Sequence, residues 1–97
     1  MSYRFHPSAE AEFLDAVSYY ESRAFGLGAA FIAEFEALAN LIAESPKAWQ
    51  VELRPDIRSA PLRRFPVSII YREQLNGFEI LAVAHQRRHP QYWLGRT

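Results

Sequence analysis

The segment with the most reactive side chains lies between residues 84 and 93 and reads AHQRRHPQYW. It combines histidine, arginine and aromatic residues at the point where a strand is expected to end. Arginine presents a planar fork of donors that matches a carboxylate or a phosphate. Three more arginines precede this segment on neighbouring expected strands. We therefore predict one anion-binding surface at an end of the sheet, made of Arg63, Arg64, Arg72, His85, Arg87, Arg88, Tyr92 and Trp93.

Two other interpretations of this segment remain open. Arginine and aromatic side chains together are also typical of RNA binding, in which bases stack on rings and guanidinium planes. Alternatively, Tyr92 and Trp93 cover the edge of the sheet while the arginines pair with acidic residues of the helices. Under that second interpretation the cluster is structural and binds no partner.

Metal and cofactor chemistry has little support in the sequence. His85 and His89 are four residues apart, but His85 belongs to a strand end and His89 precedes a proline. The chain has no cysteine, which excludes cysteine nucleophiles and cysteine–zinc sites. Glycine-rich phosphate loops and the GxSxG and HExxH motifs are absent. We predict no metal and no cofactor, and His85 is the one candidate general base.

Charge divides the 97 residues into two halves. Residues 1–49 carry three basic and seven acidic residues, whereas residues 50–97 carry eight arginines and four acidic residues. The length and the 49% hydrophobic content fit a single domain over residues 1–97. No apolar run approaches the ~20 residues of a membrane span, and the N-terminus lacks the apolar stretch of a signal peptide. We expect a cytoplasmic protein.

Apolar spacing predicts two helices after a short strand at residues 3–6. The first helix is expected over residues 8–24, with Ser8 as its N-terminal cap. The second is expected over residues 28–44, and Gly26 supplies a left-handed residue at the break between them. The two apolar stripes are Ala9, Phe13, Val17, Tyr20 and Ala24, then Phe31, Phe35, Leu38 and Ile42.

Three strands are predicted after a loop at residues 46–57: 58–64, 67–72 and 78–85. Asn76-Gly77 favours a tight hairpin between the last two. Ile69 and Tyr71 should face one side of the sheet, and Ile70 and Arg72 the other. These elements predict an α+β fold in the order β-α-α-β-β-β. An antiparallel helical hairpin would pack on one face of an antiparallel sheet and leave the other face at least partly open.

Several of these segments resemble the RelE/ParE superfamily, the toxins of type II toxin–antitoxin modules. The resemblance lies in the opening His6-Pro7 with the acidic helix start, the Ser45-Pro46 helix end, RRFPVSIIYRE and ILAVAHQRRHPQYW. It covers nearly the whole chain and is closer to the ParE branch. It implies a small α+β toxin that is neutralised by a ParD-like antitoxin encoded beside it.

The resemblance leaves the target open between three hypotheses. ParE-like members are described as inhibitors of DNA gyrase. RelE-like members cut mRNA on the ribosome with basic residues and a tyrosine, and this chain offers Arg63, Arg72, His85, Arg87 and Tyr92 for that reaction. The third hypothesis is an interaction module without toxicity.

An antitoxin would contact both charged and apolar side chains. Its acidic segment would meet arginines of the basic half through charge-assisted hydrogen bonds. Tyr19 lies off the apolar stripe, and together with Phe25 it would supply an exposed apolar patch. The predicted antitoxin contacts are Tyr19, Phe25, Arg58, Arg64 and Arg72.

Overall fold

Two amphipathic helices follow the first strand in the computed structural model, which describes residues 2–97. Helix α1 spans Pro7–Arg23 and helix α2 spans Leu27–Glu44, each within one residue of the predicted bounds. The predicted stripe of α2 is buried: Phe31, Phe35, Leu38 and Ile42. Aromatic rings of α1 pack against it, with Phe13 centred 4.7 Å from Phe35. Spacings of three and four therefore produced one buried face on α2. On α1 the predicted stripe is buried at Ala9 and half-buried at Phe13, Val17 and Tyr20, whereas Ala24 lies beyond the helix end and is exposed.

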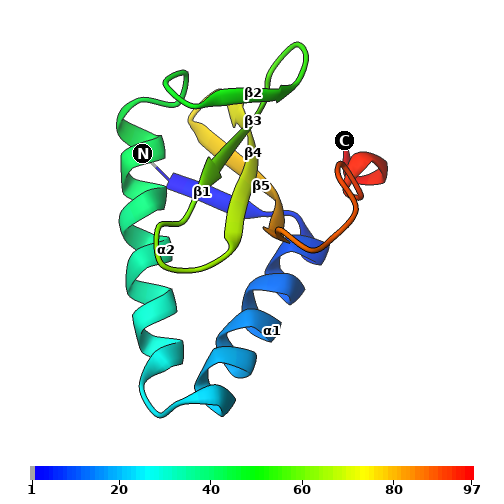
Figure 1. Cartoon of the computed structure of the whole chain (residues 1–97). Helices are drawn as coiled ribbons and strands as arrows, with labels where there is room; N and C mark the ends of the chain where they lie inside the picture. The colour runs from blue at the N-terminus through cyan, green and yellow to red at the C-terminus, as the bar shows by residue number, and fades with distance from the viewer. Residues whose placement is uncertain (1) are drawn as a thin grey trace.

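The link between the helices depends on glycine and on one carboxylate. Gly26 has a φ of 85°, the left-handed conformation that was predicted for it. Glu21 accepts hydrogen bonds from the backbone N–H groups of Gly26 and Gly28, both at 3.0 Å. It thus satisfies backbone donors at the start of α2, where the N-cap residue Gly26 has no side chain that could do so. The tip of this hairpin points away from the sheet (Figure 1).

The cap of α1 differs from the prediction. Nδ1 of His6 accepts a hydrogen bond from the backbone N–H of Ser8 at 3.1 Å, so His6 is the cap and Ser8 lies inside the helix. Pro7 occupies the first turn, where its missing N–H costs nothing.

Five strands form one sheet in the order β1-β5-β4-β3-β2. Their bounds are β1 Ser2–Phe5, β2 Gln50–Leu53, β3 Ile57–Pro61, β4 Val67–Gln74 and β5 Gly77–His85. The α+β class and the predicted order of elements are confirmed, with β2 as an additional strand inside the predicted loop. The sheet is mixed rather than wholly antiparallel because β1 runs parallel to its neighbour β5. The strand predicted over 58–64 ends at Pro61, so Arg63 and Arg64 lie in a loop.

The sheet has a core on each face. Ile69 and Tyr71 pack with the helices, and Ile70 belongs to the opposite core, as the strand alternation predicted. That opposite core also contains Trp93, from the C-terminal segment that we define as residues 86–97. This segment ends in the short 3₁₀ helix Leu94–Arg96. The second face is therefore covered in part by the C-terminal segment.

Residues 2–97 contain neither a membrane-spanning helix nor a cluster of three metal ligands. None of the helices there is both long and apolar enough to cross a bilayer. The same residues contain no group of three histidine, aspartate or glutamate side chains that would hold a metal ion.

Candidate functional site

The predicted anion-binding residues lie in three places rather than at one end of the sheet. Strands β4 and β5 are antiparallel, with Val67 opposite His85 and Arg72 opposite Glu79. Arg72 is therefore five residues along β4 from the end where His85 lies, a separation of about 17 Å at the usual rise per residue. The sequence predicted strands β4 and β5. It did not predict that their pairing separates Arg72 from His85 and from the arginines that follow His85.

His85, Arg87 and Arg88 form the part of the cluster that stays together. They line a groove of about 400 Å³ between the end of β5 and helix α1, with Ala16 and Tyr19 on the helix side. Nδ1 of His85 accepts a hydrogen bond from the backbone N–H of Arg87 at 3.0 Å, which fixes the turn after β5. Arg87 is exposed and forms no ion pair with any residue between 2 and 97.

Arg88 is held on two sides although 54% of its side chain is exposed. Its guanidinium carbon lies 3.9 Å from the centre of the Tyr92 ring, a cation–π contact. Its Nη1 is 3.9 Å from Oε2 of Glu12, at the outer limit of an ion pair. Arg87 and Arg88, with His85 and Tyr92, are the residues that we call the basic surface.

Arg63 and Arg64 lie beside helix α2, in the loop before β4. Glu34 accepts hydrogen bonds from the backbone N–H groups of both arginines and from Nε of Arg64 at 3.0 Å. Burial alone would raise the pKa of Glu34, but these hydrogen bonds outweigh it and hold the pKa below its usual range. The two arginines line a groove of about 610 Å³ whose other walls are mostly apolar: Ala33, Ala37, Leu38, Leu41, Pro61 and Leu62.

The interpretation in which helix carboxylates neutralise the arginines is therefore correct in part. Glu34 pairs with Arg64, and Glu12 pairs with Arg88 and Arg96. The side chain of Arg64 is nevertheless 67% exposed, so its pairing leaves donors available to a partner.

Two further arginines of the predicted site have structural partners. Arg72 is 3.5 Å from Glu79 on the neighbouring strand. Nη1 of Arg58 donates to the backbone carbonyls of Lys47 and Trp49, which ties the loop before β2 to strand β3. Both guanidinium groups are thus engaged within the protein.

Trp93 is a correction to the predicted site. Its side chain is only 2% exposed because it fills the core under the second face of the sheet, beside Ile70 and Leu81. It has no surface to offer to a target.

The predicted apolar patch is exposed but divided. Phe25 is fully exposed at the tip of the helical hairpin, and Tyr19 is 56% exposed. Tyr19 lines the groove beside the basic surface, whereas Phe25 is not among the residues of that groove.

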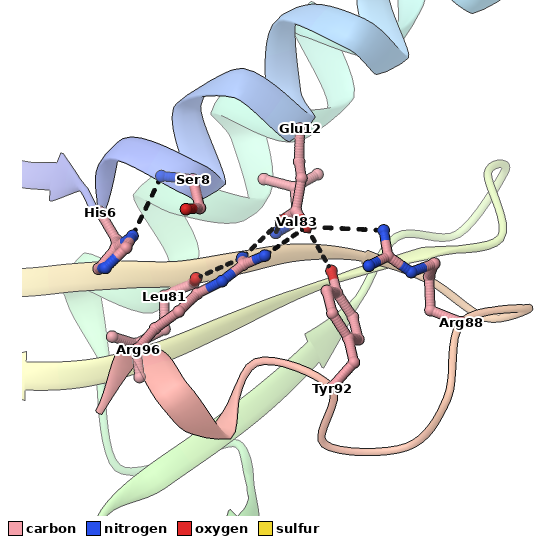
Figure 2. A network of polar contacts seen from close by, with 8 residues as sticks. All are labelled: His6, Ser8, Glu12, Leu81, Val83, Arg88, Tyr92 and Arg96. Atoms are coloured by element: carbon pink, nitrogen blue, oxygen red, sulfur yellow. Dashed lines mark hydrogen bonds and ion pairs between the residues drawn. The ribbon is translucent and has the colours of Figure 1, made fainter.

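Glu12 holds the C-terminal segment against helix α1, as Figure 2 shows. It accepts two hydrogen bonds from Arg96 at 2.9 Å, one from the Tyr92 hydroxyl at 2.8 Å and one from the backbone N–H of Val83 at 3.0 Å. Arg96 also donates to the carbonyl of Leu81 at 3.0 Å. We call Glu12, Val83, Arg88, Tyr92 and Arg96 the Glu12 network.

The Glu12 network shifts the acidity of its members. Burial favours the neutral carboxyl of Glu12, but the hydrogen bonds from Arg96, Val83 and Tyr92 prevail and lower its pKa. Burial and the hydrogen bond to Glu12 raise the pKa of Tyr92 to about 12. The Tyr92 hydroxyl is therefore neutral at physiological pH, and its proton is committed to Glu12.

Sequence reasoning missed Glu12 and Arg96. Glu12 belongs to the acidic start of the first helix, and its partners lie more than seventy residues away. The sequence contains one usable signal, a carboxylate at the edge of the apolar stripe of α1, next to Phe13.

Comparisons with known proteins agree with this architecture. Residues 3–90 match the family described as ParE toxin of type II toxin-antitoxin system, parDE. A solved structure from the chromosomal ParDE toxin–antitoxin system of P. aeruginosa is similar in fold, with a TM-score of 0.68 and 18% sequence identity. The alignment covers 88% of this chain and 95% of that one. No curated protein matches the sequence. Because the family match extends over most of the chain, the protein belongs to the ParE family of toxins of type II toxin–antitoxin systems.

Proposed function

We propose that this ParE toxin stops growth by binding DNA gyrase through the basic surface, and that a ParD-like antitoxin neutralises it. The observation that carries the proposal is that two candidate ribonuclease residues, Tyr92 and Arg72, lie apart, and that the Tyr92 hydroxyl is already bonded to Glu12. The Tyr92 hydroxyl donates to Glu12 and has a pKa of about 12, and Arg72 lies at the other end of strand β4. A ribonuclease of the RelE kind needs such groups around one phosphate, so their separation favours a binding function over RNA cleavage.

The basic surface suits an anionic partner surface. Arg87 is exposed without an ion pair to residues 2–97, and Arg88 keeps more than half of its side chain exposed. Guanidinium groups bind carboxylates and phosphates with two parallel hydrogen bonds, which gives direction as well as charge. Tyr19 adds an exposed ring on the opposite wall of the same groove.

Expression of the chain in bacteria, with and without an adjacent antitoxin gene, tests this function. Gyrase inhibition predicts filamentation and an induced DNA-damage response, relieved by the antitoxin. Arg87→Ala with Arg88→Ala should abolish the effect while leaving the circular dichroism spectrum unchanged. A rapid stop of protein synthesis with cut mRNA would favour the ribonuclease, and normal growth would favour a non-toxic interaction module.

The groove beside Arg63 and Arg64 is our proposed antitoxin site. Its apolar walls would bind apolar side chains of the antitoxin, and the two arginines would donate hydrogen bonds to carboxylates of an acidic antitoxin segment. Ala37→Arg would place a large cation in this groove, so we expect it to prevent neutralisation and leave toxicity intact. Ala29→Arg, on an exposed part of α2 outside the groove, is the matched control and should still be neutralised. Equal neutralisation of both variants would exclude this groove.

A further inference from the structure

The orientation of Arg88 depends on residues outside its own loop. Its guanidinium lies over the ring of Tyr92, at 3.9 Å from the ring centre, with Glu12 at 3.9 Å from Nη1. The ring is in turn held by the hydrogen bond from the Tyr92 hydroxyl to Oε2 of Glu12. Glu12 thus acts on Arg88 both through charge and through the ring beneath it (Figure 2).

Glu12 is itself fixed to the sheet where strand β1 ends. Strand β1 pairs with β5 only as far as Ile80. Beyond that point, the carbonyl of Leu81 accepts from Arg96, and the N–H of Val83 donates to Glu12. Side chains of Glu12 and Arg96 therefore bond to the backbone of β5 where β1 no longer pairs with it. These backbone atoms set the position of the Glu12 carboxylate.

We propose that Glu12 is the positioning residue of the basic surface, because it holds the Tyr92 ring and so presents Arg88 to an anionic partner in one orientation. This inference rests on the proposed function. A free arginine side chain loses rotamer entropy when a partner immobilises it, whereas an arginine already stacked on a fixed ring loses less. Removal of the carboxylate should then weaken binding, although it also removes a competing anion.

A double-mutant cycle between Glu12 and Arg88 distinguishes positioning from general stability. Purified toxin variants would be titrated against DNA gyrase. We expect Glu12→Gln to weaken binding at least tenfold, and Arg88→Ala to weaken it similarly. If Glu12 acts through Arg88, adding Glu12→Gln to Arg88→Ala should produce less than a twofold further loss. Glu10→Gln removes one charge from an exposed position of the same helix and should bind within twofold of the parent protein.

Two additional measurements keep the test independent of folding and of the target. Tyr92→Phe retains the ring but loses the hydroxyl, so it should weaken binding about threefold or more, even if Glu12→Gln does not fold. In the isolated toxin, ¹⁵N relaxation of the Arg88 Nε–H group should show greater mobility in Glu12→Gln than in Glu10→Gln.

The possible failures are distinguishable. If the parent toxin does not bind gyrase, the proposed function is wrong, and the relaxation measurement alone decides whether Glu12 positions Arg88. If Arg88→Ala weakens binding but Glu12→Gln strengthens it or leaves it unchanged, the positioning role is wrong and the basic surface stands. Fully additive losses in the double variant would also overturn the positioning role.

Discussion

At the scale of single residues, two helix carboxylates connect the halves of this protein. Glu12 binds the backbone of β5 and side chains of the C-terminal segment. Glu34 binds the loop that carries Arg63 and Arg64. Both accept hydrogen bonds from backbone N–H groups as well as from guanidinium groups, which explains why the pKa of each is lowered despite burial. The acidic first half and the Arg-rich second half thus form specific pairs.

The lowered pKa of Glu12 predicts a pH-dependent contribution to stability. A carboxylate whose folded pKa lies below its unfolded value stabilises the fold fully above the unfolded value, about pH 4.3 for glutamate, and less as pH falls through the folded pKa. Its neighbour Arg96 stays cationic, and Tyr92 stays neutral, throughout this range. We expect Glu12→Gln to lower the free energy of unfolding by about 2–3 kcal/mol at pH 7.

Urea unfolding between pH 7 and pH 3 checks this expectation. The difference between the parent protein and Glu12→Gln should shrink as the pH falls, whereas Glu34 remains in both proteins and cancels. A constant difference over the whole range would show that the charge of Glu12 does not matter.

At the scale of elements, the helical hairpin depends on close contact at Gly28. A Cβ atom at this position would lie 2.9 Å from the carbonyl oxygen of Val17 and about 3 Å from the side chain of Glu21. That carbonyl belongs to helix backbone and cannot move without displacing α1. Gly28→Ala should therefore destabilise the protein by about 1–3 kcal/mol. Thermal unfolding of Gly95→Ala, where a Cβ meets no atom within 4 Å, is the control; equal melting temperatures for the two variants would contradict the contact.

The position of the C-terminal segment depends on the burial of Trp93. Its ring is 2% exposed in the core beside Ile70 and Leu81, so Trp93→Ala should cost about 3–5 kcal/mol of unfolding free energy in urea titrations. Leu94→Ala changes the next residue, which is 47% exposed, and should cost far less. A small loss for Trp93→Ala would mean that the segment does not depend on this core for its position.

The elements with a long periodic pattern and the short strand β1 could be predicted from the sequence, whereas the short strand β2 could not. The stripe of α2 and the alternation of β4 are local signals that burial then confirmed, and the stripe of α1 is buried or half-buried as far as Tyr20. Strand β2 has four residues and no buried position, so its sequence carries no alternation to detect. His6 and not Ser8 is the helix cap because its Nδ1 accepts from the backbone N–H of Ser8, so that the helix already begins at Pro7.

The candidate site was predictable in composition but not in arrangement. His85, Arg87, Arg88 and Tyr92 are close in sequence, so a turn after β5 is enough to bring them together. The place of Arg72 depends on the β4–β5 register, and that of Glu12 on the packing of α1 beside β5. The antiparallel hairpin of β4 and β5 is a local element that places Arg72 away from His85, whereas the contact of Glu12 with β5 joins distant parts of the chain, which local patterns do not encode.

At the scale of the whole molecule, the helices and the C-terminal segment cover opposite faces of one sheet. Grooves at α2 and at α1, one on each side of the helical hairpin, contain arginines beside apolar side chains. We propose that the groove at α2 receives the antitoxin and that the basic surface near α1 receives the target. Neutralisation then requires that an antitoxin bound in the groove at α2 also cover the basic surface.

Gyrase-dependent DNA cleavage with purified components tests the proposed target most directly. The parent toxin, incubated with DNA gyrase, ATP and plasmid DNA, should cause cleaved DNA to accumulate, and the folded Arg87→Ala, Arg88→Ala variant should not. Supercoiling and cleavage identical to a reaction without toxin, together with mRNA cut on toxin-treated ribosomes, would contradict gyrase as the target.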